Sequence, residues 1–472
     1  MSDATMNQTD ILSRMDDSKI TKQHWKVMFI SGMGFFTDAY DLFIIGVVIS
    51  ILKDEWHPSP WAVGLVTSTA LLAAAFGAII FGRVADMLGR KRIYGYEVLV
   101  LAAGAIASAF SPDIWWLIGF RIILGIGIGG DYPVSATLMS EFSGKKSRGM
   151  MVSLVFAMQA AGLIVGPLLA AAFLASGLSK DLVWRLLLAF GAVPALAVFQ
   201  MRRHMAESPR YLLAIGQHDD AHAAAGHLLG EGRGAVKDSK AAKKTSFFEG
   251  FVALTLRRSL VVRLIGASAA WFLMDFAYYG NTVSSPLVLH AVSPNDNLMT
   301  ETLTQLAIFA IAAVPGYFVA AAMMDRMGRK TIQIMGFAMM ALSFAAIALI
   351  PGIEKLVYPF LIVYGISYFF TEFGPNATTF VYPAELFPVA GRTTGHGIAS
   401  ATGKLGGFVG VFFFPILLSA GGLLAAESMA AAVSLLGILV TVFMLPETKN
   451  KSLEELSIEE SGTPDTAIAR AA

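Results

Sequence analysis

Four ionisable residues lie inside long apolar stretches of this chain. Asp38, Asp131, Asp275 and Lys404 are each flanked by about ten mostly apolar or small residues on either side. Stretches of this kind are typical of helices that cross a bilayer, where burying a charged group costs at least a few kcal/mol. Such residues are rarely kept there without a function. The pattern indicates a pump-like or porter-like membrane protein that moves protons.

The composition also indicates a membrane protein. Of the 472 residues, 56% are hydrophobic and 15% are charged, whereas soluble domains carry about 25% charged residues. The net charge of +1 gives no reason to expect a nucleic-acid partner. Because the chain has no cysteine, disulfides, Cys-ligated metals and catalytic thiols are excluded. Residues 1–24 are polar and carry no cleavable signal, so the first apolar run is expected to be an uncleaved anchor.

Apolar runs separated by turns or charges predict an all-α membrane protein with about twelve spans, since each span needs about 20 apolar residues. Helices are expected throughout because a backbone in lipid must satisfy its own hydrogen bonds. The expected spans are 25–52, 61–85, 93–111, 114–140, 149–176, 183–201, 261–290, 301–324, 331–350, 356–384, 394–420 and 422–445.

Lys and Arg gather in alternate loops between these spans. The positive-inside rule therefore predicts that both termini and the basic loops are cytoplasmic, in a cell membrane. The expected division is a cytoplasmic tail (1–24), an N-terminal six-helix bundle (25–203), a cytoplasmic linker (204–259), a C-terminal six-helix bundle (260–445) and a cytoplasmic tail (446–472).

Three loop motifs occur twice, at offsets of 239 to 244 residues. We expect these loops to make charge contacts between the halves that hold one conformation and break in another; tight turns that merely carry charge are the alternative. A parallel duplication with a site between its halves is a known transporter plan. The repeated residues are Asp86, Gly89 and Arg90 with Asp325, Gly328 and Arg329; Glu141 and Arg148 with Glu385 and Arg392; and, more loosely, Glu207-Ser-Pro-Arg210 with Pro446-Glu447-Thr-Lys449.

Similar offsets relate the polar residues inside the spans. Each half thus presents a polar group at a similar depth on corresponding helices, which predicts a shared cavity; scattered structural hydrogen bonds are the alternative. The pairs are Asp38 with Asp275, 237 apart, and Asp131 with Asn376 and Gln159 with Lys404, both 245 apart.

The seventh expected span carries a polar face. Trp271, Asp275 and Tyr279 are four residues apart, so they lie on one side of a helix, with Tyr278 beside them. Their position in the middle of the run favours a site over an interfacial aromatic belt. Tyr and Trp supply donors, and a carboxyl group donates when protonated and accepts when ionised.

Two sets of motifs resemble known families. The Asp-x-x-Gly-Arg-Lys loops resemble the cytoplasmic loop signature of the major facilitator superfamily, and the Glu-Ser-Pro-Arg and Pro-Glu-Thr-Lys stretches resemble those of its sugar-porter-type members. This resemblance implies two six-helix bundles that rock about a central site. The run from Gly129 to Glu141, Gly-Gly-Asp-Tyr-Pro-Val-Ser-Ala-Thr-Leu-Met-Ser-Glu, closely resembles the signature of the phosphate:proton symporter family.

This second resemblance implies proton-coupled import of inorganic phosphate. The residues that match the family's phosphate contacts are Tyr132, Gln159, Trp271, Asp275, Tyr279 and Asn376. The residues that match its proton and charge positions are Asp38 with its neighbour Asp41, Asp131, Asp275 and Lys404.

Phosphate chemistry suits these side chains. Hydroxyl, indole and amide donors can replace the water shell of the anion, while Asp275 can accept its P–OH proton. Lys404 is expected to supply the only fixed positive charge, and to pair with Asp38 or Asp131 when the site is empty. Protonation of a buried carboxylate then favours anion binding. Arsenate, a near isostere of phosphate, is expected to compete, and the protein to work as a monomer.

Two other functions stay open at this point. A proton-coupled symporter for an organic anion would usually have an arginine at the site, and one for a sugar would usually have more Asn and Gln. Neither is conspicuous here. A phosphate-sensing receptor would be favoured by a long signalling tail, but only a short polar stretch follows residue 446. No catalytic, metal-ligand or nucleotide-binding constellation is found, so neither an enzyme nor a cofactor is expected.

Overall fold

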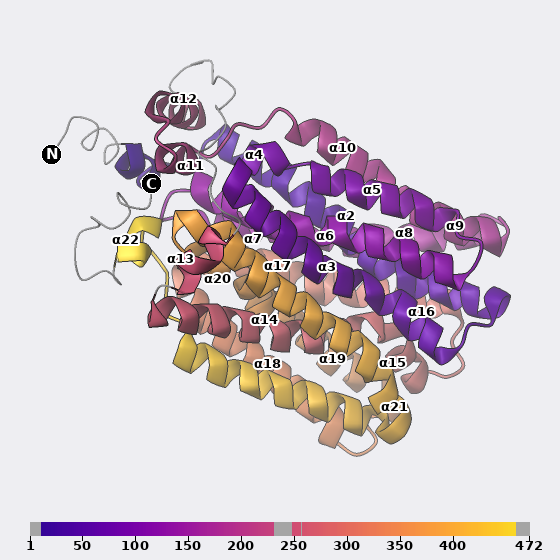
Figure 1. Cartoon of the computed structure of the whole chain (residues 1–472). Coiled ribbons are helices and arrows are strands. Elements are labelled where there is room, and N and C mark those ends of the chain that lie inside the picture. The colour runs from indigo at the N-terminus through magenta and orange to yellow at the C-terminus, as the bar shows by residue number, and fades with distance from the viewer. Residues whose placement is uncertain (1–10, 231–247, 256, 459–472) are drawn as a thin grey trace.

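The computed structural model of the protein describes residues 11–230, 248–255 and 257–458, drawn in colour in Figure 1. Every element assigned in this part of the chain is a helix. The all-α fold class predicted from the sequence is therefore confirmed.

The first half of the chain contains six spans, three of which are interrupted by a short break. They are α2 (Lys22–Trp56), α3 (Pro60–Leu88), α4 (Arg90–Ile93) with α5 (Tyr96–Ala109), α6 (Ile114–Phe142), α7 (Arg148–Ala157) with α8 (Gln159–Ala175), and α9 (Lys180–Phe190) with α10 (Ala192–Arg202). Three short helices follow: α11 (Pro209–Ala214), α12 (His218–Leu229) and α13 (Glu249–Thr255).

The second half begins with α14, and two of its spans contain a π-turn. It comprises α14 (Arg258–Val283) with α15 (Ser285–Val292); α16 (Leu298–Ile308), η1 (Phe309–Ala313) and α17 (Val314–Met327); α18 (Arg329–Leu349); η2 (Ile353–Lys355); α19 (Val357–Thr371), η3 (Glu372–Asn376) and α20 (Ala377–Leu386); η4 (Val389–Gly391); α21 (Arg392–Met444); and α22 (Leu453–Ile458).

Ten helical stretches in the described part of the chain are long and apolar enough to cross a membrane. One of them, Val389–Met444, reverses where Gly421 and Gly422 leave the helical conformation, so it makes two spans. The helices from Val357 to Leu386, which η3 interrupts, make a further span. The twelve predicted spans are thus confirmed, with their ends within a few residues of the expected positions.

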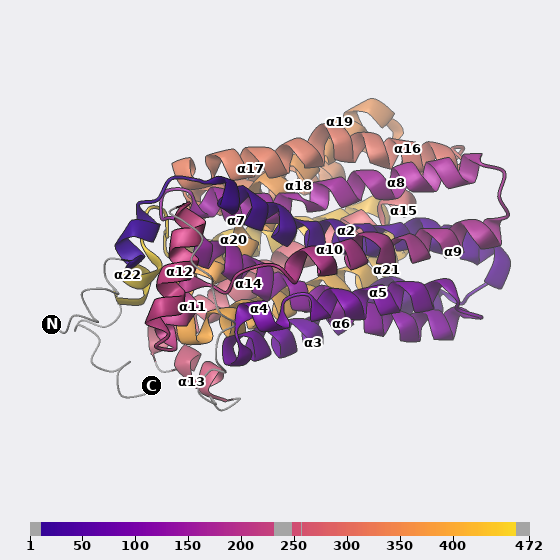
Figure 2. The same cartoon turned by 90° about the horizontal axis from the view of Figure 1, so that it is seen from above.

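The long helices run side by side as one elongated bundle (Figures 1 and 2). Helices α11, α12, α13 and α22 gather at one end of it, which also carries Arg90, Arg148, Arg329 and Arg392. We call this the basic-loop end. The bend in α21 and helix α15 lie toward the opposite end (Figure 1). Both described chain ends therefore lie at the basic-loop end.

Small residues on α6 allow its neighbours to approach closely. Asp113 starts α6 by accepting the backbone N–H groups of Trp115 at 2.8 Å and Trp116 at 3.2 Å. A β-carbon on Gly127 would lie 2.5 Å from the backbone nitrogen of Leu101 on α5. The glycine run before Asp131 is therefore a helix-packing surface, and it lies inside α6 rather than after a strand, as a dinucleotide-binding loop would require.

The two repeated loop glycines have the same backbone conformation, and a glutamate of the same half binds each of their loops. Gly89 has φ of +97° and Gly328 has φ of +94°, a region that residues with side chains rarely adopt. The carboxylate of Glu207 accepts the N–H of Lys91 at 3.1 Å beyond the first loop. The carboxylate of Glu447 accepts the N–H of Lys330 at 3.1 Å beyond the second. The looser sequence match around Glu207 and Glu447 therefore corresponds to equivalent contacts.

The two halves of the chain pack directly against each other through their long helices. Within each half α3 packs on α6 and α14 on α21, while α21 also packs on α3 and α17 on α7 across the halves. That residues 25–203 and 260–445 move as separate bundles stays a prediction. The predicted tails 1–24 and 446–472 and the linker 204–259 lie partly outside the described residues.

A substitution of Gly328 tests the loop geometry. Gly328→Ala adds about 1–2 kcal/mol of backbone strain and drives a methyl group against the Glu447 carboxylate. Gly352→Ala is the matched control, because Gly352 has φ of +76° but nothing within 4 Å of its would-be β-carbon. We expect a clearly lower thermal midpoint in detergent for Gly328→Ala than for Gly352→Ala. Equal midpoints would mean that the close approach of Glu447 to Gly328 does not affect the stability of the protein.

Candidate functional site

The centre of the site is an ion pair between the long helices α14 and α21. Lys404 donates to the Asp275 carboxylate at 3.2 Å and to the Tyr279 hydroxyl at 3.0 Å. Its ammonium group also lies 4.3 Å from the centre of the Tyr132 ring, on α6. A lysine is thus held by one carboxylate and two phenol rings, from both halves of the chain.

A chain of neutral hydrogen bonds extends from this pair across the two halves. Gln159 on α8 donates to the Tyr132 hydroxyl at 2.9 Å and accepts from the Tyr317 hydroxyl of α17 at 3.0 Å. Asn376 donates to the same Tyr317 hydroxyl at 3.3 Å. Donors of the first and second half are therefore joined in one network.

A break in the tenth span positions Asn376. The segment Glu372–Asn376 forms the π-turn η3, in which Gly374 is non-helical and Pro375 lacks the N–H group that would bond to the preceding turn. Glu372 and Asn376, four residues apart, touch each other as well as the network, since the Asn376 amide donates to the Glu372 carboxylate. Such π-turns are frequent at functional sites.

All six predicted substrate-contacting residues meet in this cluster. The Trp271 ring lies 6.1 Å from the Tyr132 ring, and it shares the face of α14 with Asp275 and Tyr279. None of the six side chains is more than 3% exposed, so the cluster is closed to solvent at both ends of the bundle. The six are Tyr132, Gln159, Trp271, Asp275, Tyr279 and Asn376.

The predicted proton-handling acids lie beside this cluster in two different states. Asp131 accepts hydrogen bonds from Arg202 at 2.9 Å and from Ser135 at 2.5 Å, and Arg202 also donates to Glu97 at 2.7 Å. The carboxylates of Asp38 and Asp41 are buried without a hydrogen-bond partner in the described part of the chain. Asp38 interacts electrostatically with Asp131, Arg202, Asp41 and Lys404.

Two expectations about charge are corrected here. Lys404 pairs with Asp275 rather than with Asp38 or Asp131, because both residues face the same gap between α14 and α21. Lys404 is not the only buried cation of the spans, because Arg202 at the end of α10 is fully buried against Asp131. The sequence placed Arg202 at a span end, where a basic residue is ordinarily read as a loop charge.

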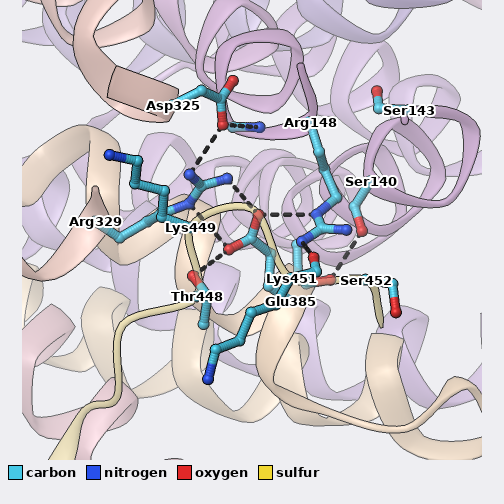
Figure 3. A network of polar contacts seen from close by, with 12 residues as sticks. Ser140, Ser143, Arg148, Asp325, Arg329, Glu385, Thr448, Lys449, Lys451 and Ser452 are labelled. Atoms are coloured by element: carbon cyan, nitrogen blue, oxygen red, sulfur yellow. Dashed lines mark hydrogen bonds and ion pairs between the residues drawn. The ribbon is translucent and has the colours of Figure 1, made fainter. Parts of the chain in front are cut away.

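The repeated loops close the basic-loop end through buried ion pairs between the halves. Figure 3 shows Glu385 at the centre of one group, where it accepts from Arg148 at 2.9 Å and from Arg329 at 2.7 Å. Asp325 binds Arg329 at 2.9 Å and accepts the backbone N–H of Met150 at 2.8 Å. Arg148 and Met150 belong to the first half, so the contacts cross between the halves.

The equivalent residues of the other repeat make a second group. Glu141 accepts from Arg90 at 3.1 Å and from Arg392 at 3.1 Å. Asp86 pairs with Arg90 at 3.1 Å and accepts the N–H of Thr394 at 2.7 Å. Both predicted sets of loop residues therefore join the halves, as expected for an interdomain charge contact.

The regions before and after the spans reinforce this closure. Arg210 binds Asp16 at 2.6 Å and also pairs with Glu454 of α22. Burial opposes ionisation of Glu454, but the adjacent Arg210 guanidinium lowers the pKa of this carboxyl below its usual value. The contact is consequently an ion pair at neutral pH. It connects segments near the two ends of the described chain.

Several residues of the site were not predicted from the sequence. Tyr317 and Glu372 complete the central network, while Arg202 donates both to Asp131 and to Glu97. The signal for Glu372 was an acid inside an apolar span, the same signal that identified Asp275. Tyr317 had no such signal, since a single tyrosine in a membrane helix is common.

The Glu385 group predicts how firmly this end is closed. Glu385→Gln leaves Arg148 and Arg329 buried without a full countercharge, and breaking a buried pair in this way costs about 3–5 kcal/mol. Ser140 is buried and donates to the Ala384 carbonyl of the other half at 2.8 Å, so a Ser140→Cys substitution reports on access to this end. We expect this cysteine to react with maleimide at least about tenfold faster when Glu385 is changed to Gln than when Glu385 is present.

Maleimide labels only the introduced cysteine, because the chain has no cysteine of its own. Asp54→Asn is the matched control, since Asp54 forms an exposed salt bridge of 3.0 Å with Lys180. In this variant the cysteine at position 140 should react at the same rate as in the protein with Asp54. Unchanged labelling in Glu385→Gln would contradict a closing role for Glu385.

Comparison with known proteins places this arrangement in a family. The family model described as "Sugar (and other) transporter" matches residues 27–459. A probable inorganic phosphate transporter 1-6 of Arabidopsis thaliana is 36% identical, over 97% of this chain and 98% of the relative. Inorganic phosphate transporter 1-6 of Oryza sativa subsp. japonica is 36% identical, over 95% of each.

Solved structures agree on the fold. The proton:xylose symporter XylE of the major facilitator superfamily, bound to 6-bromo-6-deoxy-D-glucose, superposes with a TM-score of 0.80 at 19% identity, covering 93% of this chain and 100% of that chain. A partially occluded inward-open form of the xylose transporter XylE from E. coli gives a TM-score of 0.72 at 18% identity, over 91% and 99%. The chain therefore has the fold of these solved transporters, and it belongs to the sugar (and other) transporter family and, within it, to the family of its inorganic phosphate transporter relatives.

Proposed function

We propose that this protein is a secondary active transporter that imports inorganic phosphate together with protons by alternating access. The proposed setting is the plasma membrane or the bacterial inner membrane, with both termini cytoplasmic and the protein acting as a monomer. The names of the relatives support phosphate as cargo. The basic-loop end would then be the cytoplasmic end.

The observation that carries the proposal is the Lys404–Asp275 pair inside a shell of neutral donors. A single lysine attracts an anion without the tight grip of an arginine cluster, which suits a site that must release its cargo. Tyr132, Tyr279 and Asn376 can donate to phosphate oxygens, since each carries an O–H or N–H group. Trp271 and Gln159 complete the proposed substrate contacts.

Coupling follows from the same pair. In the closed structure Asp275 neutralises Lys404 at 3.2 Å. A proton on Asp275 would cancel its charge, and Lys404 would then be free to face an entering anion. Binding of a proton and of phosphate would therefore favour each other, and loss of the proton on the other side would restore the ion pair and expel the anion.

The other acids are proposed to carry or balance protons. The carboxylates of Asp38 and Asp41 have no hydrogen-bond partner in the part of the chain that the structure describes, although Arg121 interacts electrostatically with Asp41, and Arg202 and Lys404 with Asp38. A proton on either acid would remove a buried charge that no hydrogen bond stabilises. Asp131 is held by Arg202 and would give up that partner only with a conformational change. We propose that these three acids deliver protons to the central site.

Alternating access is proposed to use the two halves as moving bodies, residues 25–203 against 260–445. The ion pairs around Glu141 and Glu385 close the basic-loop end, which is the proposed cytoplasmic end, and release of cargo there would require them to break. The pairs lie between the halves and involve residues of both, which supports a role in gating rather than in fixing single turns.

Uptake into proteoliposomes tests the proposal. Purified protein should accumulate radiolabelled phosphate when a pH gradient, acidic outside, is imposed, and arsenate should compete with phosphate. Asp275→Asn cannot carry the coupled proton, and we expect its accumulation to fall at least about tenfold. Absence of gradient-dependent phosphate accumulation by the unmodified protein would favour an organic anion or a sugar as cargo. Binding of phosphate without transport would instead indicate a receptor.

Lys404→Ala separates anion binding from coupling. Loss of the ammonium leaves Asp275 without its countercharge, so the variant should fail to concentrate phosphate under a gradient while keeping part of its phosphate exchange activity. Lys355→Ala is the matched control, because Lys355 is an exposed lysine of the same half, and it should transport normally. Full concentrative uptake by Lys404→Ala would contradict the proposed role of the pair.

A further inference from the structure

Glu372 is a buried acid that touches the central site from the second half. Its side chain is 0% exposed. One carboxylate oxygen accepts from Asn376, and the other, Oε1, has no hydrogen bond of good geometry in the described chain. No arginine or lysine is paired with it among the described residues. Glu372 therefore differs from Asp131 and Asp275, each of which has a cation.

A second acid of this kind lies farther along the same half. Glu427 is also 0% exposed and follows the α21 bend at Gly421–Gly422 by one turn, so it lies toward the end opposite the basic loops. One of its oxygens accepts from Asn281 of α14 at 3.4 Å, and the other has no hydrogen-bond partner within the described part of the chain. No cation is paired with it in the described residues either.

Polar groups occupy the space between the two acids. The Tyr364 hydroxyl donates to the backbone carbonyl of Asn281 at 3.4 Å and lies 3.4 Å from the Tyr368 hydroxyl, one turn farther along α19. The hydroxyls of Thr282 and Ser285 are buried beside them without a partner of good geometry. Buried hydroxyls of this kind normally bind protein groups or water.

A small cavity lies along this line. Its lining includes Tyr278, Asn281, Thr282, Ser367 and Tyr368, and it has a volume of about 10 Å³. That is about the space that one water molecule needs. The cavity is therefore polar and large enough to hold water between Asn281, which bonds Glu427, and Tyr278, which lies next to Glu372.

The groups that face each acid set its charge balance. Glu372 interacts with Tyr278 and Asp275 on α14 and with Tyr317 on α17, besides its neighbour Asn376. Glu427 interacts with Asn281 on α14 and with the phenols of Tyr364 and Tyr368 on α19. Apart from Asp275 these are neutral hydroxyls and amides. Because a buried carboxylate without a bonded cation is costly when ionised, the surroundings of each acid favour its neutral form over its charged form.

We propose that Glu372 is a further proton-binding residue of the transport cycle, and that Glu427, the phenols of α19 and the cavity form the route by which its proton arrives from the end opposite the basic loops. This inference rests on the proposed function. A proton from that side would bind the Glu427 carboxylate, pass over water and hydroxyl groups, and neutralise Glu372. When the site opens at the basic-loop end, Glu372 would release the proton to water there.

The position of Glu372 gives this proton an effect on cargo. Asn376, a proposed phosphate contact, donates to Glu372 in the closed structure. An ionised Glu372 would hold that amide and repel an anion. A protonated Glu372 would weaken both effects and supply an O–H donor beside the network. The second half would thereby carry a coupling acid in addition to Asp275, separate from Asp38, Asp41 and Asp131 of the first half.

The number of protons transported with each phosphate tests the inference. In proteoliposomes, the gradient at which net phosphate flux reverses gives this number. Glu372→Gln mimics the protonated acid, so it should keep phosphate exchange within about threefold of the unmodified protein but carry about one proton fewer. Its limiting accumulation should fall about tenfold for each unit of imposed pH difference. Glu354→Gln, a partly exposed acid of the same half, is the matched control and should behave normally.

Two further variants keep the test decisive. Glu427→Gln leaves the Asn376 contact intact, and it should slow gradient-driven uptake without changing the proton number or exchange. Glu372→Asp keeps a carboxyl group, and it should keep the proton number with a shifted pH profile. An unchanged proton number in Glu372→Gln, or equal loss of binding and exchange in both Glu372 variants, would overturn the proposal. Failure of the unmodified protein to accumulate phosphate would instead count against the proposed function itself.

Discussion

A charge inside the membrane-spanning part of this protein must find its countercharge within the chain, because hydrocarbon offers none. The structure obeys this constraint at two of the buried bases in the spans. Lys404 is paired with Asp275, and Arg202 with Asp131 and Glu97. The acids without a bonded cation in the described chain include Asp38 and Glu372, and these are the groups whose neutral form requires a proton.

The same constraint acts at the basic-loop end, but with the opposite consequence. Glu385 and Glu141 each bind two arginines. Removing such pairs from water costs nearly as much as their attraction returns, so they add little stability overall. Their value is that they exist in one arrangement of the halves and not in another. Because Glu207 and Glu447 hold the repeated loops from within each half, the arginines are presented at fixed positions.

The sequence was sufficient for the spans and for most of the central cluster. The apolar runs were long, and Trp271, Asp275 and Tyr279 shared one helix face by spacing alone. The offset between the halves related Asp131 to Asn376 before any fold was known. The predicted positions of these residues were correct because helix periodicity and internal duplication both appear as regular spacings in the sequence.

The pairings could not be obtained in that way. Which acid faces Lys404 depends on the rotation of α14 and α21 against each other, and the sequence does not contain it. Arg202 lay at a span end, and only the packing of α10 against α5 and α2 buries it. Glu372 depends on η3, where Gly374 and Pro375 change the helical register.

The ion pair at the centre also bears on how an empty carrier could reset. With Asp275 ionised and Lys404 protonated, the closed and empty site carries no net charge from this pair. In the proposed cycle, an anion that enters with protons on the acids leaves the loaded site close to neutral as well. Burial in a low dielectric penalises net charge steeply, so both closed forms avoid that penalty. A site with the anion but without protons would not, and this difference in energy is what would couple the two fluxes.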